Sequence, residues 1–416
     1  MSNLIETAEI IERVILLGVN CSDEEEAQRS LDELAELADT AGAEVLDRML
    51  QNREKAHPAS YLGKGKIEEV RERIRKLDAS GVICDDELSP AQMRNLENAL
   101  STKVMDRTML ILDIFAKRAS TSEGKIQVEL AQLKYSAARL VGLRASLSRL
   151  GGGIGTRGPG EKKIDMDRRR IHERIGQLKS ELEEVKRHRS LTRKSRSASF
   201  IAAIVGYTNA GKSTLLNLLS DSEVLTEDKL FATLDPTTRK LKLPSGQEML
   251  ITDTVGFIRK LPHNLIEAFK STLEEAKYAD LIIHLVDASS PEADTHMLVV
   301  YDTLRSFDIG GKEIITVYNK IDQCDEKTRM PRDFHADHTL KISAKTGEGI
   351  EELKELLESV LRSRKIYIDR IFSYREAGKI QMIRKWGELL SEEYREEGIA
   401  VKAWIPSDMY ENICKK

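Results

Sequence analysis

The stretch Ile201-Ala-Ala-Ile-Val-Gly206-Tyr-Thr-Asn-Ala-Gly211-Lys212-Ser213-Thr214 decides the fold. Its apolar start has the length of a buried strand, and leucines at helical spacing follow its end. Between them stands GxxxxGK[S/T], a phosphate loop in the strand–loop–helix setting that it requires. Such a loop curls its backbone N–H groups around a phosphate at a helix N-terminus. We expect Lys212 to neutralise the β- and γ-phosphates and Ser213 to bind Mg²⁺. The expected phosphate-loop contacts are Gly206, Tyr207, Thr208, Asn209, Ala210, Gly211, Lys212, Ser213 and Thr214.

Three further motifs follow apolar runs of strand length: Asp253-Thr-Val-Gly256, Asn319-Lys-Ile-Asp322 and Ser343-Ala-Lys345. We expect Asp253 to hold Mg²⁺ through water and the N–H of Gly256 to meet the γ-phosphate. The carboxylate of Asp322 can accept two hydrogen bonds from guanine, whereas adenine offers neither donor at that edge. The set therefore predicts a site for GTP. Its expected contacts are Asp253, Thr254, Val255, Gly256, Asn319, Lys320, Ile321, Asp322, Ser343, Ala344 and Lys345.

The segment Leu230-Phe-Ala-Thr-Leu-Asp-Pro-Thr-Thr-Arg239 lies between the phosphate loop and Asp253, where a γ-phosphate sensor is needed. We expect Thr233 to complete the Mg²⁺ shell, with Thr237 or Thr238 as the alternative ligand. The neighbouring residues would line the ribose and phosphates; they are Phe231, Ala232, Thr233, Leu234 and Asp235. The residues expected to act in GTP hydrolysis are Lys212, Thr233, Asp253 and Gly256.

The residue after Gly256 is Phe257, where many GTPases place a glutamine that orients the attacking water. A phenylalanine ring cannot hydrogen-bond water. We therefore expect slow intrinsic GTP hydrolysis that a partner accelerates.

The rest of the chain predicts an α/β fold with several parts. The P-loop GTPase domain, with a mostly parallel sheet, would span residues 199–363 and be followed by a small α+β unit at 364–416. An α/β domain at 1–120 and a helical hairpin at 121–189 would precede it, with a polar, basic linker at 190–198. Within the first domain we predict strands at 14–19, 44–49, 81–84 and 103–112 and helices at 23–40, 65–77 and 89–100. In the last unit we predict strands at 365–374 and 399–405 and a helix at 378–390.

Two heptad seams predict the hairpin. Apolar residues recur at spacings of three and four, first from Ile126 to Leu140 and then from Ile171 to Val185. The glycine-rich stretch Gly151-Gly-Gly-Ile-Gly-Thr-Arg-Gly-Pro-Gly160 separates them. An antiparallel pair of helices with a glycine-rich tip follows. The tip also matches GxGxxG, but it lies between helices rather than after a strand, so we do not interpret it as a dinucleotide site.

Composition narrows the function only a little. The 416 residues carry a formal net charge of −4, which indicates no partner for the chain as a whole. The four cysteines lack metal-ligand or disulfide-framework spacing, so we expect free thiols. Neither a signal peptide nor an apolar run of membrane-spanning length is evident. We expect a cytoplasmic monomer that does not read DNA sequence.

Residues 154–198 are locally basic, with 14 Lys/Arg against 7 Asp/Glu. Such an excess suits contacts with RNA phosphates, although a solvated coiled coil would show it too. Glycines at an exposed tip would let the backbone approach RNA closely. The candidate RNA-binding residues are Gly151, Gly152, Gly153, Gly155, Arg157, Gly158, Arg168, Arg169 and Arg170.

Together these motifs resemble the HflX family of translational GTPases, within the wider TrmE–Era–EngA group. The resemblance rests on the nucleotide motifs GYTNAGKST, LFATLDPTTR, DTVGF, NKID and SAK, and on GGGIGTRGPGE at 151–161 followed by DMDRRR at 165–170. It implies a hairpin that binds the large (50S) ribosomal subunit and its rRNA, with the tip near the peptidyl-transferase region. It also implies that binding stimulates GTP hydrolysis and helps to split or rescue stalled ribosomes, with Ser213 and Thr233 as Mg²⁺ ligands.

Other functions stay open. The hairpin could direct a GTPase switch to another RNA or to a protein. A tRNA-modifying GTPase like TrmE is less favoured, because we do not interpret the C-terminal Glu411-Asn-Ile-Cys-Lys-Lys416 as the cysteine-containing motif in which that relative ends. The segment Tyr61-Leu-Gly-Lys-Gly-Lys66 lacks the length of a phosphate loop, so an anion or RNA contact there is a minor alternative.

Overall fold

The structure is a computed structural model of the whole chain. It describes residues 11–21, 23–150, 159–194, 200–220, 230–231, 233–261, 273–325, 328–406 and 409–414, without the side chains of 141–150, 159–165, 190–194, 406 and 414. The chain divides into two compact units. Unit 1 comprises Met1–Arg189, Thr226–Asp235 and Val255–Glu274, and unit 2 comprises Ser190–Leu225, Pro236–Thr254 and Glu275–Lys416.

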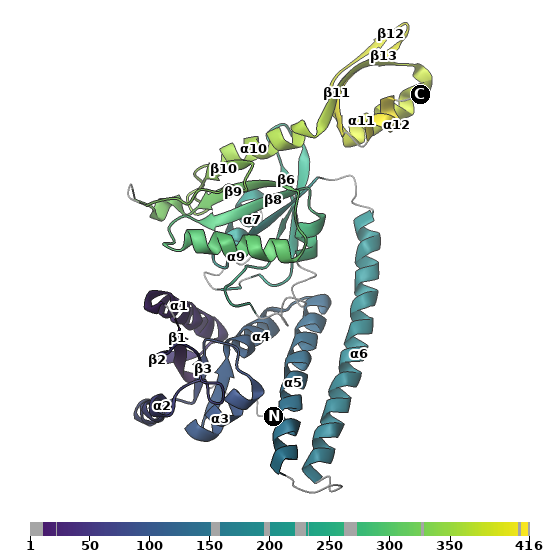
Figure 1. Cartoon of the computed structure of the whole chain (residues 1–416). Coiled ribbons are helices and arrows are strands. Elements are labelled where there is room, and N and C mark those ends of the chain that lie inside the picture. Colours follow the sequence, from purple (N-terminus) through teal and green to yellow (C-terminus); the bar gives the residue numbers. More distant parts are fainter. Residues whose placement is uncertain are drawn as a thin grey trace, which may run out of the picture. The chain divides into compact units, whose positions relative to one another are not determined.

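Unit 1 is built on a parallel sheet with the strand order β2-β1-β3-β4, against which helices pack (Figure 1). Its strands are β1 (Arg13–Asn20), β2 (Glu44–Asn52), β3 (Gly81–Cys84) and β4 (Lys103–Asp106). Its helices are α1 (Glu24–Ala41), α2 (Lys64–Leu77), α3 (Pro90–Leu100), α4 (Arg107–Arg118), α5 (Ser122–Leu150) and α6 (Pro159–Lys194), the last of which extends past the end of the unit.

Short polar side chains and glycine mark the helix ends of this unit. Asp23 accepts two backbone N–H bonds at the start of α1, and Gly42, with a φ of +85°, ends that helix. Ser89 and Gln92 form a capping box at the start of α3, whose first residue is Pro90. These are the residue types that satisfy the free backbone groups of a helix end, so local sequence sets these boundaries.

One of the strand predictions was wrong. The run 103–112 is extended only to Asp106, and α4 begins at Arg107. The carboxylate of Asp106 accepts the N–H of Met109 at 2.9 Å, so Asp106 caps the helix. The apolar residues that follow it bury a helical face instead of continuing the strand. An aspartate inside an apolar run is a helix-start signal, and here it outweighs the β-propensity of its neighbours.

Helices α5 and α6 lie side by side and run antiparallel (Figure 1). Glu123, near the start of α5, pairs with Arg189 at 3.2 Å, and Glu129, further along α5, pairs with Arg174 at 2.7 Å. The partners on α6 come in the reverse order, as antiparallel helices require. Leu178 is fully buried in the predicted seam. The antiparallel helical hairpin is thus confirmed.

The buried carboxylate of Asp106 also joins the sheet of unit 1 to the hairpin. It accepts hydrogen bonds from the backbone N–H of Leu88 at 3.0 Å, the hydroxyl of Tyr135 at 2.7 Å and the guanidinium of Arg139 at 2.7 Å. Tyr135 and Arg139 both belong to α5, and the Arg139 guanidinium lies over the Tyr135 ring. A buried charge that lost these partners would be costly, so the network anchors α5 firmly.

Unit 2 contains a six-stranded sheet in the order β10-β9-β8-β5-β7-β6. All neighbouring strands are parallel except β6 and β7, and α9 and α10 lie on opposite sides (Figure 1). The mostly parallel sheet that we predict is confirmed. Its strands are β5 (Ile201–Gly206), β6 (Thr237–Lys242), β7 (Glu248–Asp253), β8 (Leu281–Asp287), β9 (Glu313–Asn319) and β10 (His338–Lys341). Its helices are α7 (Lys212–Ser220), α9 (Ala293–Ser306), the short η1 (Ile321–Gln323) and α10 (Ile350–Ser363).

The chain ends in an antiparallel sheet with the order β11-β13-β12. Its elements are β11 (Lys365–Phe372), η2 (Tyr374–Glu376), α11 (Ala377–Trp386), β12 (Glu388–Arg395), β13 (Gly398–Pro406) and α12 (Tyr410–Cys414). The predicted α+β unit is confirmed, but strand β12 was missed. Its sequence, ELLSEEYR, is largely polar because the strand lies at a sheet edge, and it lacks the apolar alternation that signals a strand.

A buried polar cluster lies inside unit 2. His284 on β8 pairs in register with Thr316 on β9, and Asp333 accepts a hydrogen bond from the Thr316 hydroxyl at 2.5 Å. The Tyr301 hydroxyl donates to the same carboxylate at 2.6 Å. Burial lowers the pKa of His284, and the nearby Asp333 offsets that effect only in part. The imidazole is therefore folded into the sheet in its neutral form.

This cluster predicts an acid-sensitive fold. The unfolded chain takes up a proton at His284 as the pH falls below about 6.5, whereas the folded chain resists it. Stability from this residue is therefore present above that pH and lost below it. We expect the melting temperature of unit 2 to fall less between pH 7 and pH 5.5 in His284→Gln than in the unmodified protein. The control is His172→Gln, because the His172 ring is exposed on α6. Equal pH dependence in all three proteins would contradict the assignment.

Candidate nucleotide-binding site

The loop at 206–213 begins where β5 meets β8. A side chain at Gly206 would overlap the backbone oxygen of Leu285, so the close approach of the two strands requires glycine. Asn209 and Gly211 have φ angles of +60° and +94°, which bend the loop. Helix α7 then begins at Lys212. The loop therefore presents its backbone at a helix N-terminus, where anions bind favourably.

The ammonium group of Lys212 is buried under this loop. Its side chain donates a hydrogen bond to the backbone oxygen of Tyr207 at 2.8 Å. Burial lowers the pKa of Lys212 to about 8, and the charge of Asp253 opposes this shift. A desolvated cation gains much from a phosphate that arrives beside it. Lys212 is thus placed to bind a phosphate of the nucleotide.

Ser213 and Asp253 lie together next to the loop. The Ser213 hydroxyl donates to the carboxylate of Asp253 at 2.8 Å, and that carboxylate is buried. Asp253 ends β7 beside Ile204 of β5, and the Thr254 hydroxyl donates to the Ile204 backbone oxygen at 2.7 Å. Hydroxyl and carboxylate oxygens are the ligands that Mg²⁺ prefers. The two side chains fit the expected magnesium site.

The side-chain amide of Asn319 joins three of the predicted motifs. It donates to the backbone oxygen of Ala210 at 2.8 Å and accepts the N–H of Ala344 at 2.9 Å. The Ser343 hydroxyl donates to the carboxylate of Asp322 at 2.6 Å. Asp322 itself is exposed. Its carboxylate is therefore held in one orientation while its remaining acceptors face outward, as a receptor for the guanine edge requires.

Two contacts at the site were missed in the sequence. The ammonium of Lys320, a residue with a φ of +63°, pairs with Asp287 at 2.8 Å. The ring of Tyr207 in the phosphate loop stacks on His296 of α9, with the ring centroids 3.8 Å apart. Asp287 ends a buried strand, which is a signal for a site residue at a sheet edge. His296 carries no such signal, because it is one polar residue on a helix.

Several predicted site residues are in unit 1, whereas the phosphate loop is in unit 2. Their roles in the nucleotide site stay predictions. They are Phe231, Thr233, Leu234, Asp235, Val255 and Gly256. Ala232 lies outside the described residues.

The candidate RNA-binding residues are only partly described. Arg169 and Arg170 are exposed on α6, and Arg168 is half-buried. Two other cations, Arg174 and Arg189, form the ion pairs that hold the hairpin together. The remaining candidates lie outside the described residues; they are Gly151, Gly152, Gly153, Gly155, Arg157 and Gly158.

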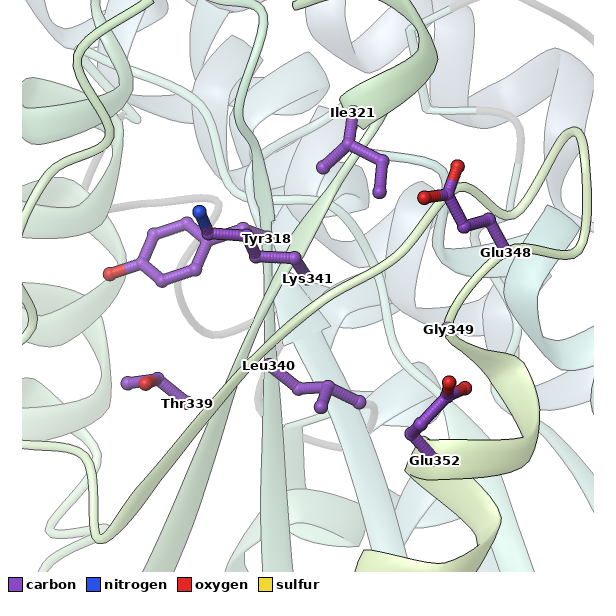
Figure 2. Close-up of a pocket in the computed structure, with 8 residues that line it drawn as sticks. All are labelled: Tyr318, Ile321, Thr339, Leu340, Lys341, Glu348, Gly349 and Glu352. Atoms are coloured by element: carbon purple, nitrogen blue, oxygen red, sulfur yellow. The ribbon is translucent and has the colours of Figure 1, made fainter.

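A pocket of about 490 Å³ lies beside residues 319–322, which we call the base-selecting loop (Figure 2). It is lined by Tyr318, Ile321, Thr339, Leu340, Lys341, Glu348, Gly349 and Glu352. Ile321 is the one predicted nucleotide contact among these, and its side chain faces that of Glu348 in Figure 2. The pocket therefore adjoins the candidate nucleotide site without containing its phosphate-binding residues.

The described residues hold no group of three or more His, Cys, Asp or Glu that could bind a metal ion by themselves. Cys21, Cys84 and Cys324 are free thiols, as we expect from their spacing. Over the same described parts of the chain, no helix is long and apolar enough to cross a membrane.

The sheet, the loop at its strand ends and the base-selecting motif define a P-loop GTPase. A GTPase HflX from Lacrimispora saccharolytica is 66% identical over 99% of this chain and 98% of its own length. The chain belongs to the HflX family of GTPases, which confirms the resemblance seen in the motifs, and it is a GTP hydrolase.

More distant relatives have the same name. A GTPase HflX from Caldanaerobacter subterraneus is 50% identical over 97% of this chain and 93% of its own length. The Escherichia coli GTPase HflX is 42% identical over 83% of this chain and 82% of its own. Among solved structures, a GTP-binding protein from Sulfolobus solfataricus in complex with GDP covers 84% of this chain and 98% of its own, with 23% identity and a TM-score of 0.45.

Family models match in three consecutive parts of the chain. The model described as GTP-binding GTPase N-terminal matches residues 28–116, and GTP-binding GTPase Middle Region matches 118–196. The model described as 50S ribosome-binding GTPase matches residues 201–320. The first two models cover most of unit 1, including the hairpin helices.

The geometry of the base-selecting loop gives a prediction for Asp322→Asn. Guanine would then face an amide instead of a carboxylate, and we expect GTP affinity to fall at least about a hundredfold while xanthosine triphosphate binds. Ser343→Ala removes the hydrogen bond that orients Asp322, and we expect a loss of about tenfold. Titration calorimetry with GTP, ATP and XTP measures both. Asp302→Asn, at an exposed position on α9, is the control. Unchanged GTP selectivity in Asp322→Asn would contradict the assignment.

Proposed function

We propose that this GTPase acts on the large (50S) ribosomal subunit through the hairpin of α5 and α6, with Mg²⁺ as its cofactor. Contact with the subunit stimulates GTP hydrolysis, and the cycle splits or rescues stalled ribosomes. The description of the model that matches residues 201–320 supports a 50S partner. The hairpin is the observation that carries the proposal.

The length and the positive charge of the hairpin suit contact with RNA. Helix α5 has 29 residues and is therefore roughly 40 Å long. Asp106 fixes the middle of this helix to the sheet through Tyr135 and Arg139, and ion pairs join α6 to it. Arg169 and Arg170 are exposed on α6. The part of α5 beyond Arg139 forms, with α6, a basic projection that suits an RNA partner with a deep binding region.

The buried ring of Phe257 supports stimulation by a partner. Its side chain is only 4% exposed and follows directly after Gly256 of the DxxG motif. It supplies no hydrogen bond to orient a water molecule. Without such a group the attack on the γ-phosphorus is slow. A partner that supplies the missing polar group would therefore control the rate.

For hydrolysis, GTP would be held both through its phosphates and through its guanine. Lys212 neutralises charge on the phosphates, and Asp322 with Asn319 fixes the guanine. Mg²⁺, held by Ser213 and Thr233 and through water by Asp253, would stabilise the charge that builds up on the β- and γ-phosphate oxygens. Water attacks the γ-phosphorus as its bond to the bridging oxygen breaks, which yields GDP and phosphate.

The proposed magnesium ligand Ser213 gives one prediction. Ser213→Ala removes a hydroxyl oxygen, so nucleotide affinity should lose its dependence on Mg²⁺. We expect addition of Mg²⁺ to tighten binding of a non-hydrolysable GTP analogue at least about tenfold in the unmodified protein and less than about twofold in the variant. Ser220→Ala, at the end of α7, is the control. An equal Mg²⁺ effect in Ser213→Ala would count against the assignment.

The ribosomal partner gives a second prediction. The protein with a GTP analogue should co-sediment with 50S subunits, and the subunits should raise GTP turnover at least about tenfold. The double variant Arg169→Ala/Arg170→Ala should weaken binding about tenfold and lower its salt dependence. Binding to naked RNA or to an unrelated protein instead of 50S would support the alternative partners.

A matched charge control keeps that test specific. Lys240→Ala/Lys242→Ala removes two exposed cations from β6, outside the hairpin. This variant should bind 50S subunits as the unmodified protein does. The ribosome proposal fails if the unmodified protein stays out of the 50S pellet at low salt, or if its turnover is fast without a partner.

A further inference from the structure

The carboxylate of Asp235 is hydrogen-bonded by the turn that precedes α5, within unit 1. One carboxylate oxygen accepts the backbone N–H groups of Ser120 and Thr121, each at 2.9 Å, and the Ser120 hydroxyl at 2.7 Å. The other oxygen accepts the Thr121 hydroxyl at 2.5 Å. We call Asp235 with Ser120, Thr121 and Gly124 the Asp235 clamp. These four hydrogen bonds join residues more than a hundred positions apart in the chain.

Gly124, in the first turn of α5, leaves room for this carboxylate. A side chain at Gly124 would overlap a carboxylate oxygen of Asp235, so any other residue here would force the carboxylate to shift. The N–H of Gly124 donates to the Thr121 hydroxyl at 3.0 Å, which continues the cap into the first turn of α5. Burial alone would raise the pKa of Asp235, but the bonds from Thr121 and Ser120 outweigh it and lower that pKa. A carboxylate at a helix N-terminus is also stabilised by the helix dipole.

Two further contacts fix the nucleotide-sensing segments to the same unit. The ring of Phe231 meets that of Phe115 of α4 edge to face, with centroids 4.8 Å apart, although its φ of +54° is unusual for a bulky residue. Lys260, four residues after Gly256, pairs with Asp85 and, at 2.8 Å, with Asp86, which follow β3. Both segments that would sense the γ-phosphate are thus built into the unit that carries the hairpin.

We propose that Asp235 is a positioning residue that couples the nucleotide bound at the phosphate loop to the N-terminal end of the hairpin helix α5. The inference rests on the proposed function, in which Thr233 reaches Mg²⁺ beside the γ-phosphate. Thr233 is two residues from Asp235, so at most about 7 Å of chain separates them. A displacement of Thr233 is therefore passed to the clamp.

The coupling acts in both directions. If GTP changes the position or the strength of the clamp, the clamp changes the affinity for GTP relative to GDP by the same factor. Binding of the hairpin to its partner would displace α5. Through the carboxylate of Asp235, this displacement would shift Thr233, which would sense the γ-phosphate. The proposed hydrolytic site and the hairpin then respond to each other through a contact within unit 1.

Hydrogen–deuterium exchange of the full-length protein tests the clamp directly, because the amides of Ser120 and Thr121 donate to Asp235. The peptide that spans 119–130 is compared with Mg²⁺ and either GDP or a non-hydrolysable GTP analogue. We expect exchange at its first amides to differ between the two nucleotides by at least about tenfold. No difference in the unmodified protein would overturn the proposal.

Two variants break the clamp from opposite sides. Asp235→Ala removes the carboxylate, and Gly124→Ala excludes it while favouring the helix, so at least the second variant should fold normally. In both we expect the nucleotide-dependent difference to fall below about twofold, and in Gly124→Ala we expect GDP affinity to stay within about threefold. Gly176→Ala, on α6 with open space around it, is the matched control and should keep the full difference. A purely structural cap would change exchange equally with both nucleotides, which would also overturn the proposal.

A third variant separates failure of this inference from failure of the proposed function. Thr233→Ala should weaken the Mg²⁺-dependent binding of the GTP analogue if Thr233 is a ligand. If that binding is unchanged while the clamp variants lose their nucleotide response, the ligand assignment fails and the coupling stands. If Thr233→Ala weakens binding while Gly124→Ala keeps the unmodified response, the ligand assignment stands and the coupling is wrong.

Discussion

The nucleotide site depends on one side-chain amide. Asn319 holds the phosphate loop through the backbone oxygen of Ala210 and the loop that follows β10 through the N–H of Ala344. A side chain at Gly211 would overlap the same amide. The bend of the phosphate loop and the position of Asn319, at the end of β9, therefore depend on each other. The parallel sheet makes this possible, because its strands deliver their carboxyl ends to a single edge. The phosphate-binding and base-selecting segments are thereby fixed relative to each other.

Much of this could be predicted from the sequence because the relevant signals are local. An apolar run, a glycine loop and a leucine-rich helix identify the phosphate loop around Lys212 without knowledge of the rest of the chain. The heptad seams predict two helices, and their short connection predicts that they are antiparallel. Helix caps such as Ser89 act within four residues. Structural features that depend on residues close together in the chain can therefore be predicted from the sequence.

The remaining features depend on contacts between distant residues. The hydrogen bonds that Asp235 accepts from Ser120 and Thr121, 115 and 114 positions away, are one such feature. Nothing in a periodicity or motif indicates such a pairing. Strand β12 was missed for a related reason, since a polar edge strand is defined by its partner β13 rather than by its own residues. The strand predicted at 103–112 failed because a capping residue outweighed an apolar run.

The anchor at Asp106 has a consequence for the dimensions of the hairpin. It grips α5 through Tyr135 and Arg139, near the middle of a helix that ends at Leu150. Each heptad added or removed beyond Arg139 would change the reach of the projection by about 10 Å and leave the grip intact. The outer part of the helix pair can therefore change in length in steps of one heptad, while the contacts that hold α5 to the sheet stay the same.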